Sequence, residues 1–253
     1  MMNRPIALLT DFGLSGHYAG SIKSVILSIN PKALIFDITH DVRPYNIREG
    51  AFILDAVFRF LPKGIIVVAV VDPGVGSERA ALCIKAGDQY LLGPDNGLLS
   101  LALRNSPFVA RKITNSRFFV KPVSPTFHGR DIFSPCAAWL SKKDVFSSLG
   151  PNLSKIRQIN FPKPSEKAGK TQGEIVYIDR FGNAMTNIQK KGKRKQTIRA
   201  ANRIVPIKPY FGVGKRGELI ALWNSSDILE LAVYNDSAGK KYGLEIGDKV
   251  EIF

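Results

Sequence analysis

Apolar residues along the first half of the chain alternate between short continuous runs and stretches with helical spacing. Continuous aliphatic and β-branched runs predict strands at residues 6–10, 33–38, 65–71, 81–86 and 89–92. Apolar residues at every third or fourth position predict helices at residues 18–28, 47–61 and 131–140. Strands that alternate with helices are typical of crossover units, so the pattern predicts an α/β domain with a central, largely parallel sheet.

The second half of the chain has a different pattern. Residues 161–171 (FPKPSEKAGKT) lose the hydrophobic periodicity and gain proline, glycine and lysine, which predicts a linker between two domains. Beyond it, short apolar runs separated by turn residues predict strands at residues 173–178, 184–188, 203–207, 219–223, 229–233 and 249–253. No helix is predicted there, so we expect a small antiparallel barrel or sandwich.

The overall composition narrows the class of protein. Of the 253 residues 45% are hydrophobic, yet no apolar run approaches the ~18 residues that a membrane span needs. The two cysteines, Cys83 and Cys136, lie in apolar stretches, as reduced and buried thiols do. We therefore expect a cytoplasmic protein without disulfides and without a membrane segment.

The formal net charge of +15 raises the question of a nucleic-acid partner. Part of this charge lies in residues 190–199 (KKGKRKQTIR), between two predicted strands. That run has no interleaved aromatic residues on which bases could stack. We therefore interpret it as a solvated hairpin and do not expect a nucleic-acid partner.

Polar residues that directly follow apolar runs are the first candidates for a functional site, because ligands of open parallel sheets bind beyond the carboxyl ends of the strands. Asp11 opens the loop DFGLSGHYAG, where its carboxylate could bind a ribose diol or form a local turn. Asp72 follows the run IIVVAVV and starts the loop DPGVGSER, which ends at Arg79. The carboxylate and the guanidinium could converge on one ligand, or form a salt bridge that only holds the loop.

His128 has the strongest case among the histidines for a catalytic role. It lies in the segment PTFHGRDIF, beside an aromatic residue, a glycine and charged residues, just before a predicted helix. A histidine there could act as a general base or as a polarising group. The alternative is a histidine with a structural role.

The segment 178–187 (IDRFGNAMTN) joins a carboxylate, an aromatic ring and an amide in one strand-turn-strand unit. Asp179 could bind hydroxyl groups, Phe181 could stack on a base, and Asn183 could pair with an adenine edge. The same residues are also good turn formers, so a tight hairpin turn is the alternative.

Taken together, the motifs resemble the S-adenosyl-L-methionine hydrolase (adenosine-forming) family, also called SAM hydroxide adenosyltransferases, which are relatives of the fluorinase and chlorinase enzymes. The resemblance covers nearly the whole chain and rests on TDFG, PYNIREGA, VDPGVGSER, GPDNGLL, FHGRDIFSP, IDRFGNAMTN and NSSDILELAV, in that order. It implies an N-terminal α/β domain, here residues 1–162, and a C-terminal antiparallel β-barrel domain, here residues 172–253. It also implies a homotrimer whose active sites lie between the N-terminal domain of one subunit and the C-terminal domain of its neighbour.

The reaction that the resemblance implies is hydrolysis of S-adenosyl-L-methionine to adenosine and L-methionine, with no metal and no cofactor. Water or hydroxide would attack ribose C5′. Asp72, Arg79 and His128 match the family's Asp-Arg-His set and would hold and polarise the water. The halogenase relatives lack this charged set, so the resemblance favours hydrolysis over halogenation.

The resemblance also implies which residues contact the substrate. They are Asp11, Tyr45, Asp179, Phe181, Asn183, Tyr210, Ser225, Ser226, Glu230 and Val233. Asp11 and Asp179 would bind the ribose and Asn183 the adenine, while the three aromatic residues would form walls. Ser225 and Ser226 would face the methionine end, and the glutamate and the valine would lie near the nucleoside. Ser226 stands where halogenases have an arginine for the methionine carboxylate.

Two other classes stay open from the residues alone. A metal-dependent phosphoesterase could hold two cations with the carboxylates and the histidine of these motifs: Asp11, Asp72, Asp131, Asp179 and His128. Against it, a guanidinium at Arg79 would compete with a cation for the carboxylate of Asp72. A non-enzymatic RNA-binding protein could use the basic run and the second domain.

Overall fold

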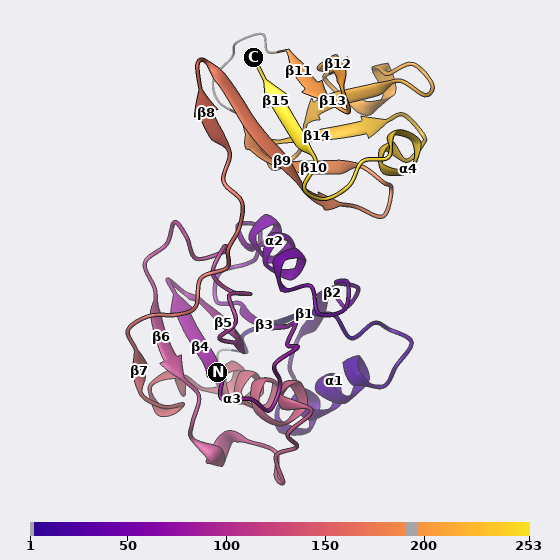
Figure 1. Cartoon of the computed structure of the whole chain (residues 1–253). Coiled ribbons are helices and arrows are strands. Elements are labelled where there is room, and N and C mark those ends of the chain that lie inside the picture. The colour runs from indigo at the N-terminus through magenta and orange to yellow at the C-terminus, as the bar shows by residue number, and fades with distance from the viewer. Residues whose placement is uncertain (1–2, 191–196) are drawn as a thin grey trace. The chain divides into compact units, whose positions relative to one another are not determined.

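The computed structural model describes residues 3–190 and 197–253, and it divides the chain into two compact units (Figure 1). The first unit ends at Asn160 and the second begins at Phe161. The domain limits expected from the sequence, 1–162 and 172–253, stay a prediction. Within the described residues, no helix has both the length and the apolar character that crossing a membrane requires.

A seven-stranded sheet forms the centre of the first unit, in the order β2-β1-β3-β5-β4-β6-β7. Its strands are β1 (Ile6–Thr10), β2 (Ile35–Thr39), β3 (Ile66–Val70), β4 (Ala81–Ala86), β5 (Gln89–Pro94), β6 (Val109–Lys112) and β7 (Asn152–Leu153). The neighbours β2-β1-β3-β5 are parallel, whereas β5-β4-β6-β7 are antiparallel. The prediction of a largely parallel sheet was therefore right for one half of the sheet only.

A two-residue turn explains why the sheet changes direction. Gly87 and Asp88 alone separate β4 from β5, and Gly87 adopts a positive φ of 57°. Such a short connection can join only antiparallel neighbours, because a parallel crossover needs a dozen or more residues.

Three helices cover the sheet, namely α1 (Tyr18–Ile29), α2 (Ile47–Phe58) and α3 (Ser134–Lys142). Ile22 and Ile26 of α1 share one core cluster with α3 and with Leu8 of β1. α2 packs on the opposite face of the sheet, where Gly50 lies close to Leu9 (Figure 1). The helix predicted at 131–140 begins earlier, as a π-helical turn (Gly129–Phe133) that runs directly into α3.

The second unit is an antiparallel sheet in the order β12-β11-β15-β9-β10-β14-β13, with β8 paired to β9. Its strands are β8 (Ser165–Lys167), β9 (Lys170–Ile178), β10 (Ala184–Gln189), β11 (Ile198–Ala200), β12 (Arg203–Val205), β13 (Leu219–Trp223), β14 (Ile228–Val233) and β15 (Lys249–Ile252). The two ends of the sheet approach each other, since Lys208 N–H donates to Ala221 C=O (2.8 Å) and Ala221 N–H donates to Pro206 C=O (2.9 Å). The sheet is therefore nearly barrel-shaped.

Two sequence-based expectations for the second unit were wrong. Part of the linker expected at 161–171 is strand, because β8 and the start of β9 form a hairpin there. A short helix, α4 (Ala238–Tyr242), also occurs where none was expected. Its start is capped by Ser237, which accepts from Lys240 N–H, and it ends at Gly243 with φ 64°. The solvated hairpin predicted for 190–199 falls mostly outside the described residues.

The core of the first unit generates a stability prediction. Leu8 of β1 is fully buried in the core cluster that includes α1 and α3, so Leu8→Ala should lower the free energy of unfolding by ~2–5 kcal/mol. The matched control Leu34→Ala removes an exposed side chain and should change it by less than ~0.5 kcal/mol. Urea titration in a Trp223→Phe background, followed by the fluorescence of Trp139, reports on the first unit. Equal effects of both substitutions would contradict this packing.

Candidate active site

The carboxyl ends of two neighbouring parallel strands bring two carboxylates together. Asp11 directly follows β1, and Asp72 lies two residues beyond the end of β3. Burial raises the pKa of Asp11, the backbone N–H of Tyr45 opposes this rise, and the charge of Asp72 adds to it. Both carboxylates therefore lie at the same edge of the sheet, where ligands of open parallel sheets bind.

Asp72, Arg79 and His128 form a continuous chain of hydrogen bonds. Arg79 Nε donates to both carboxylate oxygens of Asp72, at 3.0 and 2.9 Å, and Nη2 donates to Oδ2 as well. Nη2 also lies 2.8 Å from His128 Nδ1. Only 4% of the Asp72 side chain and 8% of the Arg79 side chain are exposed. The ion pair is thus held out of water, where electrostatic interactions are stronger than at a surface.

The contact with Arg79 determines the protonation of His128. A guanidinium has donors and no acceptor, so Nδ1 of His128 must accept the hydrogen bond and carry no proton. Burial lowers the pKa of His128 from its ordinary value of 6.5, and the charge of Arg79 lowers it further, against the opposing effect of Asp72 and Asp131. In the neutral form of His128 the proton is therefore on Nε2.

Two glycines allow the three segments of the site to meet. Gly76, in the loop between Asp72 and Arg79, has a φ of 79°, and a Cβ there would clash with Pro125 O. This loop therefore packs directly on the segment that leads to His128. Gly129 lies close to Phe12, since a Cβ there would be 3.3 Å from that ring. The backbone contacts bring residues from three loops into one place.

Tyr45 is held in an unusual conformation beside the site. Its backbone N–H donates to Asp11 Oδ2 at 2.8 Å, and its φ is 66°. A non-glycine residue in this region is strained and is found disproportionately at functional sites. Tyr45 is 74% exposed, so within the first unit it does not enclose a ligand.

The second unit contains a cavity of about 640 Å³ that is lined in part by predicted substrate residues. It is lined by Asp179, Phe181, Asn183, Phe211, Glu230, Val233, Tyr234, Asn235, Asp236 and Ser237. Five of these were predicted from the sequence. Phe211 and Tyr234 were missed, although each directly adjoins a predicted residue, and that adjacency was the available signal.

The carboxylate of Asp179 has a structural role in this cavity. Oδ1 accepts from the backbone N–H groups of Phe181 and Asn183, both at 2.9 Å, and Oδ2 accepts from Asn183 Nδ2 at 3.2 Å. The turn continues through Gly182, with φ 84°. The turn interpretation of this segment therefore describes its geometry, and the turn presents the exposed ring of Phe181 at the cavity.

Three of the substrate residues predicted in the second unit do not line this cavity. Tyr210 is 61% exposed and immediately precedes the lining residue Phe211. Ser225 and Ser226 lie in the turn between β13 and β14, where Ser226 N–H donates to Asn224 Oδ1 at 2.9 Å.

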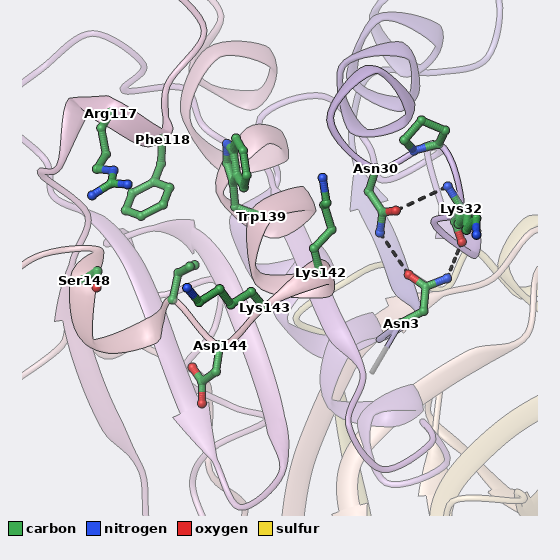
Figure 2. Close-up of a pocket in the computed structure, with 12 residues that line it drawn as sticks. Asn3, Asn30, Lys32, Arg117, Phe118, Trp139, Lys142, Lys143, Asp144 and Ser148 are labelled. Carbon is green, nitrogen blue, oxygen red and sulfur yellow. Dashed lines mark hydrogen bonds between the residues drawn. The ribbon is translucent and has the colours of Figure 1, made fainter. Parts of the chain in front are cut away.

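A second large cavity, of about 730 Å³, lies in the first unit and contains none of the predicted site residues (Figure 2). Lys142 Nζ donates to Ile29 O at 3.0 Å and lies 5.2 Å from the centre of the Trp139 ring. Asn30 Nδ2 donates to Asn3 Oδ1 at 2.9 Å and to Ser141 Oγ at 2.8 Å. These lining side chains are engaged in contacts that hold helix ends together.

The carboxylates and histidines of the described residues do not gather as a metal site would require. No group of three His, Cys, Asp or Glu side chains with suitable placement occurs among them. Both oxygens of Asp72 accept hydrogen bonds from Arg79 instead. The metal-dependent phosphoesterase therefore gains no support from the geometry.

Comparison with known proteins agrees with the resemblance noted in the motifs. The family profile of the SAM hydroxide adenosyltransferase N-terminal domain matches residues 6–150, and that of the C-terminal domain matches residues 173–251. The (R)-S-adenosyl-L-methionine hydrolase of Thermus thermophilus is 34% identical over 257 residues, which cover 98% of this chain and 99% of the relative.

More distant and structural relatives extend this comparison. A fluorinase of Actinoplanes sp. is 25% identical over 290 residues, covering 99% of this chain and 97% of the relative. The crystal structure of an uncharacterized conserved protein from Thermotoga maritima has a TM-score of 0.91 and 35% identity, covering 98% of this chain and 99% of that one. The two profiles and the full-length relatives together show that this chain belongs to the SAM hydroxide adenosyltransferase family.

Proposed function

We propose that the protein hydrolyses S-adenosyl-L-methionine to adenosine and L-methionine, by attack of water or hydroxide on ribose C5′. The observation that carries the proposal is the hydrogen-bonded chain of Asp72, Arg79 and His128, with a buried Asp72–Arg79 pair, beyond the ends of the parallel strands. The names of the full-length relatives support the same substrate. Neither the phosphoesterase nor the RNA-binding alternative has comparable support.

Catalysis of this reaction mainly requires that the protein position an oxygen nucleophile. The sulfonium sulfur leaves with the bonding electrons as a neutral thioether, so no general acid is needed. The reaction consumes one water and releases one proton. The protein must therefore hold the water in line with the C5′–S bond and stabilise hydroxide character as the new C–O bond forms.

The three residues can share this task in a defined way. Arg79 supplies positive charge that favours hydroxide, and Asp72 holds the guanidinium in place. His128 carries its proton on Nε2, so it donates a hydrogen bond to the attacking oxygen and is not the base in this tautomer. Asp72 is the carboxylate in the chain, and we assign it the role of accepting the proton of the water.

The proposed substrate contacts come from residues of the first unit and from residues of the second unit. Asp11 is the proposed ligand of the ribose hydroxyls, with Tyr45 fixed beside it. In the second unit, the adenine would stack on Phe181 and pair with Asn183, in the cavity that also includes Glu230 and Val233. Asp179 shapes this turn and would reach the ribose from it. Tyr210 remains a proposed aromatic wall, and Ser225 and Ser226 the proposed contacts of the methionine end.

We further propose a homotrimer in which the first unit of one subunit and the second unit of its neighbour form each site. The division of the candidate residues between two units supports this arrangement. The cytoplasmic location expected from the sequence stays a prediction.

The first test is direct product analysis. Purified protein incubated with S-adenosyl-L-methionine should form adenosine and methionine in equal amounts, with or without EDTA, as resolved by chromatography. Asp72→Asn, Arg79→Lys and His128→Ala should each lower kcat/KM by about 10²–10⁴-fold, because each breaks the chain that polarises the water.

A matched ion pair of the same unit serves as the control for these variants. Asp55 and Arg104 lie 3.0 Å apart near the surface, so Asp55→Asn and Arg104→Lys should leave kcat/KM within about twofold of wild type. Wild-type rates in the three site variants, or no adenosine from the wild type, would refute the assignment.

Protonation of His128 gives a second prediction. Because burial and Arg79 lower its pKa, NMR titration should show His128 becoming protonated below pH 6.5, with Nδ1 unprotonated in the neutral form. Asp72→Asn removes a charge that raises this pKa, so the midpoint should fall further. The chain has three histidines, and His128→Gln assigns the resonance. A midpoint above 6.5, or a proton on Nδ1, would contradict the proposed donor role.

Mixing of inactive variants tests the shared site. Asp72→Asn damages the first unit and Asn183→Ala the second, so each homo-oligomer should be nearly inactive. If neighbours share a site, subunits unfolded and refolded together in equal amounts should regain intact sites at about a quarter of positions, the random expectation for a cyclic trimer. A mixture as inactive as its components would mean that each site lies within one subunit.

A further inference from the structure

The cavity of about 730 Å³ in the first unit has an excess of positive charge in its lining (Figure 2). Its cationic side chains are Lys32, Arg117, Lys142 and Lys143, and its acidic side chain is Asp144. The carboxylate of Asp144 is committed to the backbone, since Oδ1 accepts from Phe146 N–H at 3.1 Å. The lining of this cavity therefore attracts an anion.

Three of these cations are available to a ligand. Lys32, Arg117 and Lys143 are exposed, and none of them forms an ion pair with a carboxylate of the described residues. Lys142 has a different role, because it donates to Ile29 O and so covers the carbonyl end of α1, which would otherwise repel an anion. Ammonium and guanidinium groups that surround one cavity can bind the oxygens of a phosphate together, through charge-assisted hydrogen bonds.

Trp139 supplies an aromatic surface among these charges. It lines the cavity, is 37% exposed, and lies between Phe118 on one side and Lys142 on the other (Figure 2). The rings of Trp139 and Phe118 meet edge to face, with 6.3 Å between their centroids, and Lys142 Nζ lies 5.2 Å from the centre of the indole. These contacts hold the indole in place. An exposed indole of fixed orientation is a surface on which a planar ring can stack.

The cavity lies at the opposite edge of the sheet from the catalytic residues. Asn3 precedes β1, whereas Asp11 follows it, and Asn30 and Lys32 lie in the connection from α1 to β2. All lining residues lie between positions 3 and 148, so the cavity belongs to the first unit alone. A ligand bound there would leave the carboxyl ends of the parallel strands free for the substrate.

Charge, ring and volume together select one class of ligand. The volume lies within the range of about 300–1,000 Å³ that is usual for small-molecule sites. A simple phosphate ion would use the cations but leave the indole without a partner, and an uncharged nucleoside would do the reverse. A nucleoside phosphate uses both, because its base stacks on the indole and its phosphate oxygens accept from the cations.

We propose that this cavity is a second ligand site of the protein, which binds a nucleoside phosphate through Trp139, Arg117 and Lys143. The inference goes beyond the proposed reaction, in which neither the substrate nor the products carry a phosphate. It stays testable whatever the outcome for S-adenosyl-L-methionine.

The probe is ADP, and the fluorescence of Trp139 reports its binding at this site. In a Trp223→Phe background Trp139 is the only tryptophan of the chain, and stacking of the base should quench it in a saturable way. Free tryptophan titrated in parallel corrects for the absorbance of the base. Adenosine and pyrophosphate, added as competitors, should displace ADP only at concentrations at least about tenfold higher, since each makes half of the contacts.

Substitutions of the cations test the phosphate contacts. Lys143→Gln and Arg117→Gln keep most of the side-chain length and remove the charge, so each should raise the Kd for ADP by about tenfold, the effect of losing one hydrogen bond to a charged group. Both positions are exposed, so the fold is retained. The matched control is Lys155→Gln, an exposed lysine of the same unit outside this cavity, which should change the Kd by less than about twofold.

Each contrary result overturns the inference in a recognisable way. Absence of saturable quenching by ADP would mean that no nucleoside phosphate binds beside Trp139. Displacement by pyrophosphate as effective as by ADP would mean a general anion site without a role for the indole. An unchanged Kd in both Lys143→Gln and Arg117→Gln would mean that ADP binds elsewhere on the protein.

Discussion

The side chain of Arg79 is a buried cation, and the residues around it in the first unit replace the water that would otherwise solvate its charge. A guanidinium has five N–H donors, so a buried one needs acceptors on several sides and a nearby negative charge. Asp72 supplies the charge and both of its oxygens, and His128 supplies a ring nitrogen. The face of the guanidinium lies 5.7 Å from the ring of Phe133, in the π-helical turn that follows His128. Loss of one partner of such a pair typically costs about 3–5 kcal/mol.

The contact with Arg79 also makes His128 a hydrogen-bond donor of defined direction. A free histidine offers either nitrogen as donor or acceptor, whereas His128 has its acceptor committed to Arg79 and one N–H left to offer. The close approach of Gly76 to Pro125 keeps the two loops at this distance, because any side chain at that position would push them apart. Backbone shape and protonation state are therefore connected in this site.

The second unit uses its polar groups differently. Asp179 accepts hydrogen bonds from the backbone of the turn that carries Phe181 and Asn183. Asn224 accepts them from the turn that carries the serines. In both places a side chain satisfies backbone N–H groups of a turn and leaves the neighbouring residues to face a ligand. Recognition by this unit therefore depends on the shape of these turns, which the two side chains maintain.

The sequence by itself determined the order of the motifs, most of the strands of both units, and the position of Asp11 and Asp72 after apolar runs, because local patterns of burial and turn formation carry this information. It also identified five residues of the cavity in the second unit. Only the tertiary structure decided the antiparallel half of the first sheet, the near closure of the second, and the inclusion of Phe211 and Tyr234 in the cavity. Likewise, the tautomer of His128 depends on the guanidinium of Arg79, which is distant in sequence, and no local pattern encodes the distance between them.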